Sequence, residues 1–549
     1  MLNSQDSSRR RAAVPSARLI ALLLIAVSLL VYHAALGHSF VNWDDRELVY
    51  ENPYLNPVTP AHLLHFWTQP YDHLYIPVTE TAYAALALTT HRIGMGSALA
   101  PRPFHAAGLL VHILSVLLVF AILRRLVRRD SAAGLGALLY AVHPLQVETV
   151  VWTGSLDTGL GNCLSLAALW QYLQFVQADQ SPEAGARSSR QRYYWTATLF
   201  FVFALLSKPS AVTVILLAGL LDWALLRHSW QASIRSLAGW IAPALAIALV
   251  TRAMQAVPPA AVTPLWARPL IAGDALAFGL GKLVWPSPLA IDYGRTPSWL
   301  LSHPWACLTV LVPLALGVIA WHLRRRHSWP LVCLGLFAAA LLPVSGLIPF
   351  AFQEYSTVAD RYYSLALLGP ALGLAFLLAR CPARSLQGAA LLVIGAFGCL
   401  SLRQVGCWEN SVTLFTHAIA VNPNSYHIQY NLANALNDAG DTPGAISRYR
   451  QALRLQPGDA EAHCNLGAAL MKAGRVDEAA DEYRQALRLN PGLSEAHEAL
   501  GLYLVDRGNL EAAIAEWQTA LRLQPENQVV RHNLEFALRQ ASQRAPRGS

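Results

Sequence analysis

Two adjacent aspartates directly after the first apolar segment are the first candidates for chemistry. They lie in the run Phe40-Val41-Asn42-Trp43-Asp44-Asp45-Arg46. Neighbouring carboxylates repel each other, which raises the pKa of one of them towards a value suited to a general base. An acidic pair in a loop is more often solvated surface. We therefore interpret Asp44 and Asp45 as catalytic candidates only in combination with other polar groups.

Further polar side chains are predicted near the same membrane boundary as the aspartates. They are His143, Glu148, Asp157, Lys208, Asp360 and Arg361. Taken singly, the cations fit snorkelling side chains and the histidine fits an interfacial hydrogen bond. Taken together, they indicate a site in which carboxylates activate an acceptor and cations hold a phosphate. No cluster demands a metal, although the aspartate pair leaves a divalent ion open.

The elements that must position these residues are apolar helices. Charge-free stretches predict about eleven membrane crossings. They lie near 19–36, 105–123, 131–147, 158–178, 193–207, 209–226, 236–251, 304–323, 328–350, 361–380 and 385–402. The segment 273–291 is predicted to be interfacial or re-entrant, because Trp285, Pro286 and Pro288 interrupt it.

Basic clusters between the apolar stretches predict the orientation. With the eleven crossings given above they share one face, which the positive-inside rule makes cytoplasmic. The clusters are Arg9–Arg11, Arg124/Arg125/Arg128/Arg129, Arg187/Arg190/Arg192, Arg227/Arg235, Arg324–Arg326 and Arg380/Arg384. The first loop and the C-terminal half then lie outside the cytoplasm. A cleavable signal peptide is the alternative for the first segment, with Ala35 and Gly37 at its end.

The C-terminal half carries a repeat of 34 residues, marked by Pro423, Pro457, Pro491 and Pro525. This is the period of the tetratricopeptide repeat (TPR), whose concave face binds peptides or proteins. We expect an all-α fold with a polytopic membrane domain at 1–403, including a first outer loop at 37–104. A TPR α-solenoid follows at 408–549. Its predicted parts are a half-repeat at 408–425, repeats at 426–459, 460–493 and 494–527, and a capping helix at 528–540.

Composition agrees with a membrane protein. Only 13% of the residues are charged and 54% are hydrophobic, which excludes a disordered chain. The net charge of +8 comes from arginines between apolar spans, so we interpret it as topogenic and expect no nucleic acid partner. The seven cysteines have no paired spacing, so we read neither a disulfide framework nor a metal site from them.

The order of the motifs resembles the transmembrane-and-TPR O-mannosyltransferase (TMTC) family and its bacterial relatives. The first-loop run Phe40–Asp45 is followed by Glu51-Asn52-Pro53. Later segments resemble the family's "HP…E", bacterial "KP…D" and "(D/E)RY" motifs. They are Ala141-Val142-His143-Pro144-Leu145-Gln146-Val147-Glu148, Ser207-Lys208-Pro209-Ser210 with Asp222, and Ala359-Asp360-Arg361-Tyr362. Each motif is weak alone, but five features in this order, with the TPR array last, are specific.

The resemblance implies a GT-C-like membrane glycosyltransferase. Such an enzyme takes a sugar, mannose in the named family, from a polyprenyl-phosphate carrier outside the cytoplasm. Asp44 or Asp45 becomes the base that activates a hydroxyl acceptor, with protein Ser/Thr expected. His143, Lys208 and Arg361 become candidates for the lipid phosphate and sugar. No cofactor is firmly implied beyond the lipid-linked sugar. The composition suggests a bacterial inner-membrane protein with its TPR domain in the periplasm.

The chain departs from the family pattern at two positions. The first loop has Leu74-Tyr75-Ile76-Pro77-Val78-Thr79 where many relatives have a basic residue before Pro-Leu-Thr, and Gly154-Ser155-Leu156-Asp157 lacks an arginine before the aspartate. Losing two cations from a phosphate-binding face keeps a second interpretation open. The chain would then be a non-enzymatic membrane scaffold whose TPR array organises an envelope assembly. A transporter is a weaker alternative, because no charge is clearly placed at mid-membrane.

Overall fold

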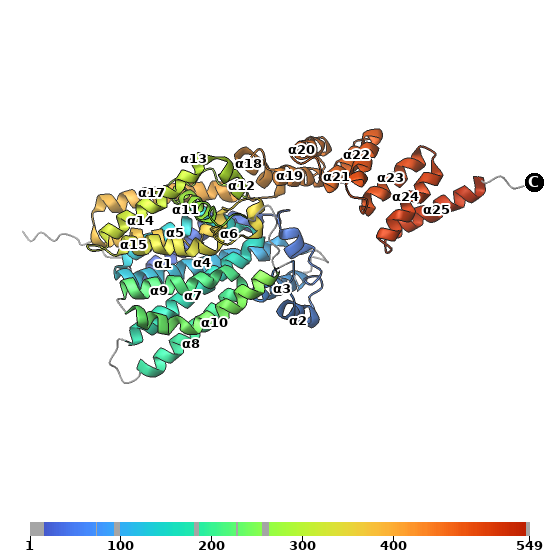
Figure 1. The fold of residues 1–549 in the computed structure, drawn as a ribbon. Helices are drawn as coiled ribbons and strands as arrows, with labels where there is room; N and C mark the ends of the chain where they lie inside the picture. Colours follow the sequence, from blue (N-terminus) through green and yellow to red (C-terminus); the bar gives the residue numbers. More distant parts are fainter. Residues whose placement is uncertain are drawn as a thin grey trace, which may run out of the picture. The chain divides into compact units, whose positions relative to one another are not determined.

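The protein is seen here as a computed structural model that describes residues 16–72, 74–92, 99–179, 186–226, 229–254 and 263–544. The named elements of this described part are all helical, and one isolated β-bridge joins Tyr71 to Leu74. The chain divides into two compact units, residues 1–410 and 411–549. Figure 1 follows their helices along the sequence. The predicted all-α class is confirmed.

The first unit contains helices long and apolar enough to cross a membrane. Among the described residues, five helical stretches meet both criteria: Ala17–Gly37, Pro101–Val127, Trp230–Met254, Pro304–Leu323 and Arg384–Gly406. Shorter apolar helices, including Asp130–Val142 and Leu368–Arg380, lie between them. The predicted total of about eleven crossings therefore stays a prediction. Arg9–Arg11 and Arg227, which were used for orientation, lie outside the described residues, as does the side chain of Arg187.

Long helices of the first unit pack side by side. α4 packs against α1, α5 and α7, α7 against α8, and α5 against α16. The bounds are α1 Ala17–Tyr32, α4 Pro101–Val127, α5 Asp130–Val142, α7 Leu156–Asp179, α8 Ala186–Ser207, α9 Val214–Leu225, α10 Trp230–Met254, α14 Leu311–Leu323, α15 Trp329–Leu341, α16 Leu368–Arg380 and α17 Arg384–Gly406. Proline in the first turn starts α4 favourably, because that position needs no N–H donor.

Short helical turns join the long helices and carry most of the candidate site. α5 leads through η3, α6 and η4 into α7, and every residue from 141 to 157 is buried. Their bounds are η3 Pro144–Gln146, α6 Val147–Val151, η4 Thr153–Ser155, η5 Pro209–Thr213 after α8, and η8 Leu342–Val344, η9 Ala351–Glu354 and η10 Asp360–Tyr363 before α16. Turns this short depend on their neighbours for stability, since isolated helices of this length do not persist in water.

The first loop, 37–104, is also helical. It contains η2 Arg46–Tyr50, α2 Pro60–Thr68 and α3 Pro77–Arg92, and η1 His33–Gly37 precedes it at the end of the first apolar stretch. Buried apolar side chains of this loop, among them Val49, Phe66 and Tyr83, share a core with Phe104 of α4. The remaining elements of the unit are α11 Arg268–Val284, α12 Pro297–Ser302, α13 Pro304–Cys307 and η7 Leu308–Val310. α11 ends immediately before Trp285, where the sequence predicts a break.

The second unit is a series of antiparallel helix pairs. α18 Ser411–Val421 precedes the pairs α19 Tyr426–Asp438 with α20 Thr442–Leu455, α21 Ala460–Lys472 with α22 Val476–Leu489, and α23 Ser494–Asp506 with α24 Leu510–Leu523, and α25 Gln528–Arg544 closes the series. The turn inside each pair has a glycine with φ between 73° and 85°, namely Gly440, Gly474 and Gly508. Only glycine adopts this backbone easily. The predicted TPR solenoid is confirmed.

Candidate active site

Asp45 ties the first loop to the turns after α5. Its carboxylate is buried, with Oδ2 accepting the backbone N–H of Val41 at 2.9 Å and Oδ1 accepting that of Gly154 at 2.7 Å. Burial raises the pKa of Asp45 to about 6, and hydrogen-bond donors, these two backbone groups among them, oppose the rise. Both oxygens are thus engaged in holding two segments together.

Asp44, its neighbour in sequence, is available for proton transfer. No hydrogen bond from another described residue reaches its carboxylate, which is partly buried. Burial raises the pKa of Asp44 to about 7, the positive charge of Arg361 opposes this, and the negative charge of Asp45 adds to it. A carboxyl with this pKa exchanges a proton near neutral pH. Of the predicted pair, Asp44 therefore has the properties of a base and Asp45 those of an anchor.

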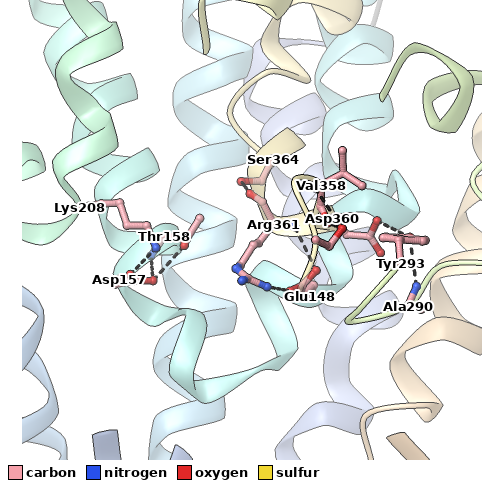
Figure 2. A network of polar contacts seen from close by, with 11 residues as sticks. Glu148, Asp157, Thr158, Lys208, Ala290, Tyr293, Val358, Asp360, Arg361 and Ser364 are labelled. Carbon is pink, nitrogen blue, oxygen red and sulfur yellow. Dashed lines mark hydrogen bonds and ion pairs between the residues drawn. The ribbon is translucent and has the colours of Figure 1, made fainter. Parts of the chain in front are cut away.

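Arg361 and Glu148 form a buried ion pair between two short turns. Nη1 of Arg361 lies 2.5 Å from Oε1 of Glu148, and the backbone N–H of Arg361 donates to Oε2 at 3.1 Å. The exposed fractions of the two side chains are 8% and 3%. Figure 2 shows this pair at the centre of a polar network. Removing one member would leave a buried charge uncompensated, so the pair fixes η10 against α6.

Lys208 and Asp157 form the second ion pair. Nζ of Lys208 contacts Oδ2 of Asp157, while Oδ1 accepts the hydroxyl of Thr158 at 2.9 Å. Lys208 follows the last residue of α8, and a Cβ at Gly161 would lie 2.7 Å from the Cβ of Lys208. Glycine therefore lets α7 and the end of α8 approach closely. With its side chain 25% exposed, Lys208 is more accessible than Arg361.

Both cations line one pocket, whose volume is about 450 Å³ with the open space at its mouth included. The polar lining comes from α7, η5 and η10. The other wall consists of apolar residues from α15, from η8 and from the segment between η10 and α16. The lining residues are Thr158, Gly161, Asn162, Lys208, Ser210, Ala211, Thr213, Ala340, Val344, Arg361, Tyr362 and Leu365. Two cations with several hydroxyl and amide groups are suited to an oxyanion beside a polyhydroxylated ligand.

Aromatic rings surround the Arg361 guanidinium. Its Cζ lies 4.4 Å from the ring centroid of Phe352, 5.0 Å from that of Tyr362 and 5.3 Å from that of Trp152. These rings hold the planar guanidinium by cation–π contacts while its charge remains available to a ligand. Phe352 and Trp152 were missed at the sequence level, because neither lies in a motif and each reaches Arg361 only through folding.

Of the predicted residues, only Lys208 and Arg361 line the pocket, and Glu148 and Asp157 are their ion-pair partners. His143 and Asp360 contact other segments. His143 is buried, with Nδ1 accepting the backbone N–H of Leu145 and Nε2 lying 3.3 Å from the carbonyl oxygen of Leu283. Asp360 accepts the hydroxyl of Tyr293 at 2.7 Å. Figure 2 shows Asp360 directed towards Tyr293, on the opposite side of Glu148 from Lys208. Both positions hold neighbouring segments in place.

Other polar residues near the site had little or no sequence signal. Asn162 lines the pocket and donates to the hydroxyl of Ser364 at 2.6 Å. Glu80 of α3 is a buried carboxyl whose pKa is raised by burial to about 8. The preceding Thr79 donates to the carbonyl of Ser207, which places this turn beside the end of α8. No group of three potential metal ligands occurs among the residues that the structure describes.

Two family profiles match parts of the chain. The profile described as dolichyl-phosphate-mannose-protein mannosyltransferase matches residues 100–254, which include α4 to α10. The profile described as tetratricopeptide repeat matches residues 400–460 and 430–494. The first match covers Glu148, Asp157 and Lys208, and the second covers the start of the helix pairs.

Curated relatives combine the same two parts. Human protein O-mannosyl-transferase TMTC1 is 24% identical over 80% of this chain and 55% of its own length. Mouse protein O-mannosyl-transferase TMTC3 is 26% identical over 76% of this chain and 49% of its own length. The chain thus spans about half the length of these relatives. Among solved structures, MamA gives a TM-score of 0.23 at 22% identity, covering 25% of this chain and 75% of that chain. The resemblance predicted from the motifs is confirmed.

Proposed function

We propose that this TMTC-like chain is a membrane glycosyltransferase. It transfers a sugar from a polyprenyl-phosphate carrier to a hydroxyl acceptor, protein Ser/Thr, on the non-cytoplasmic face of the membrane. The observation that carries the proposal is the shared pocket of Lys208 and Arg361, with Asp44 close enough to Arg361 for its pKa to respond. Mannose is the sugar suggested by the names of the relatives and of the matching profile.

The proposed reaction is a displacement at the anomeric carbon. Asp44 accepts the proton of the acceptor hydroxyl, whose oxygen attacks the anomeric carbon while the bond to the carrier phosphate oxygen breaks. The phosphate leaves with the bonding electrons, and the pocket cations stabilise its charge. Asp45 does not touch the reacting atoms in this scheme. It keeps Asp44 in place by binding Val41 and Gly154.

The two cations have different parts in phosphate binding. Lys208 and Arg361 each face a carboxylate, so these four groups together carry no net charge. A phosphate must therefore compete with Asp157 or Glu148 for its cation. Lys208 can exchange partners at lower cost, because its side chain is 25% exposed whereas that of Arg361 is 8% exposed. We assign phosphate capture to Lys208 and a fixed positive charge to Arg361.

The helix pairs of the second unit would bind the acceptor polypeptide or a partner protein. TPR arrays are binding modules, so this unit can raise the local concentration of an acceptor at the membrane. The composition and the Lys208-Pro209 motif favour a bacterial inner membrane, and the arginine clusters favour a cytoplasmic N-terminus, which with eleven crossings puts this unit in the periplasm. The acceptor, the carrier and the sugar would then meet in the compartment of Asp44.

The test is sugar transfer by the purified full-length chain from a panel of polyprenyl-phosphate sugars to periplasmic protein extract. Asp44→Asn should lower kcat by about 100- to 10,000-fold, the usual contribution of a general base. It should leave thermal stability unchanged or raised, because it removes a desolvated carboxylate. Asp45→Asn should lower stability by about 1–3 kcal/mol, since one backbone N–H loses its charged acceptor.

Asp130→Asn is the matched control. Asp130 forms an exposed ion pair with Arg124 at the start of α5, and its removal should leave transfer unchanged. Transfer at the wild-type rate by Asp44→Asn would remove that residue from the proposed role. If the wild-type chain transfers no sugar from any donor and its helix pairs still capture partner proteins, the scaffold interpretation replaces the enzyme.

A further inference from the structure

The short connector between α17 and the second unit is built into the core of the first unit. Trp408 in this connector is 3% exposed, and Val405 in the last turn of α17 is 1% exposed. The backbone N–H of Ser39 donates to the carbonyl of Glu409 at 3.0 Å. A connector that served only as a tether would lie in solvent and make few contacts. This connector instead has a defined position against the first outer loop.

The connector reaches the cationic side of the candidate site through two tryptophans. Trp408 stacks on Trp152, with ring centroids 6.0 Å apart and planes inclined by 26°. Trp152 in turn lies beneath the guanidinium of Arg361, at 5.3 Å from Cζ to the ring centroid. Both indoles are at least 95% buried. The stack is therefore held inside the protein, and a shift of one ring must displace the next.

The same connector reaches the acidic side of the site. Gly154 packs directly on Trp152, because a Cβ at this glycine would lie 2.8 Å from the indole ring. The backbone N–H of Gly154 is one of the two donors to Asp45. The other donor, Val41, lies two residues after Ser39, which is bound to the connector. Two independent routes thus join the connector to the segments that position Asp44 and Arg361.

We propose that Trp408 is a positioning residue for sugar transfer, linking the start of the TPR unit to the donor pocket. Trp408 fixes the Trp152 ring, and the Trp152 ring fixes the Arg361 guanidinium in the pocket. The proposal rests on the proposed function, because its readout is the kinetics of the donor.

The variants to compare in the full-length chain are Trp408→Ala and Trp408→Phe. Loss of the indole leaves space into which Trp152 can move, so Arg361 is held less well. We expect kcat/KM for the polyprenyl-phosphate sugar that the wild-type chain uses to fall by about 2- to 30-fold in Trp408→Ala, the range found for residues that couple sites without touching a ligand. Trp408→Phe keeps an aromatic face and should recover most of this loss. KM for the acceptor should not change.

Trp240 supplies the matched control. It is also fully buried in the first unit, where it stacks on Phe201 at 4.6 Å, and it is absent from the pocket lining. Trp240→Ala removes the same side chain at a site remote from the stack. It should lower thermal stability as Trp408→Ala does, while leaving kcat/KM for the donor unchanged per folded molecule.

The double variant Trp152→Phe/Trp408→Leu, compared with both single variants, tests the path directly and remains informative if Trp408→Ala fails to fold, because leucine fills part of the space and removes the aromatic contact. If Trp408 acts through Trp152, the losses in donor kcat/KM will not multiply. Multiplicative losses, or donor kinetics in Trp408→Phe and Trp408→Ala that match the wild type, would overturn the proposal. Absence of transfer by the wild-type chain would instead reject the proposed function, so the two failures are distinguishable.

Discussion

The proposed division of roles between Asp44 and Asp45 depends on the contacts of single residues. Asp44 and Asp45 are chemically identical and adjacent, so sequence reasoning could name the pair but not choose between them. The choice depends on which carboxylate accepts the backbone N–H groups of Val41 and Gly154. Gly154 lies 109 residues after Asp45, so only the fold brings the two together. Lys208 and Arg361 were predicted as cations at the site, yet their pairing with Asp157 and Glu148 depends on tertiary contacts.

The pH dependence of transfer should report the titration of Asp44. As the base, Asp44 works in its deprotonated form, and burial raises its pKa to about 7. We therefore expect kcat/KM to be low in acid and to rise with pH, with an inflection near pH 7 and a plateau above it. The measurement is kcat/KM for the acceptor between about pH 5 and 9.

Asp72→Asn provides the check on this assignment. The negative charge of Asp72 is among the causes that raise the pKa of Asp44, so its removal should move the inflection to lower pH. Asparagine tolerates the positive φ of 46° at this position, which makes the variant structurally mild. A rate that does not vary across this pH range would contradict the assignment of Asp44 as the base.

At the scale of elements, the two halves differ in how much their sequence reveals. The 34-residue period predicts an array of paired helices in the second unit, and α19 to α24 form three such pairs there. Hydropathy located the long helices of the first unit. It gave no information on η3, α6, η4 and η10, which carry Glu148 and Arg361 and flank Trp152, because turns of three to five residues have no periodicity of their own.

A histidine bridge between the two helices of a pair occurs twice in the second unit. His497 bridges its own helix to the next, with Nδ1 at 2.5 Å from Glu516 and Nε2 at 3.1 Å from the carbonyl of Pro491. The residue 34 positions earlier, His463, makes the same two contacts with Glu482 and Pro457. In the first repeat the equivalent residue is glutamine, which donates to the carbonyl of Pro423 at 3.0 Å.

In the first repeat the glutamine donates to the proline carbonyl while its Oε1 accepts from Arg448, so His497→Gln should keep the carbonyl contact and cost less than about 1 kcal/mol of local stability. His497→Leu leaves a partly buried carboxylate and a carbonyl without a donor, and should cost about 1–3 kcal/mol. Hydrogen exchange of the α23 and α24 amides in the full-length chain measures the difference. His532→Leu, at an exposed position of α25, should not change it. Equal exchange in the His497→Gln and His497→Leu variants would show that the bridge contributes nothing.

For the whole molecule, the division into an apolar and a repetitive part follows from composition, and the structure places it after Asn410. Composition does not reveal that the residues before this point are buried against the first loop. Trp408 has no motif around it, and only the fold brings its ring to Trp152. The number of membrane crossings decides which compartment contains the helix pairs.

The compartment of the second unit can be measured and bears directly on the function. An odd number of crossings puts the first loop and the helix pairs on the same side, whereas a crossing by α11 would separate them. We expect alkaline phosphatase fused after Ser549 to be active in a bacterial inner membrane, because this reporter works only outside the cytoplasm. A membrane-impermeant maleimide should label Gln69→Cys in the first loop of a variant without native cysteines, and should not label Arg325→Cys. If Gln69→Cys is labelled and the C-terminal phosphatase is inactive, the number of crossings is even. The helix pairs would then be cytoplasmic and unable to present an acceptor to Asp44, although the pocket chemistry would stand unchanged.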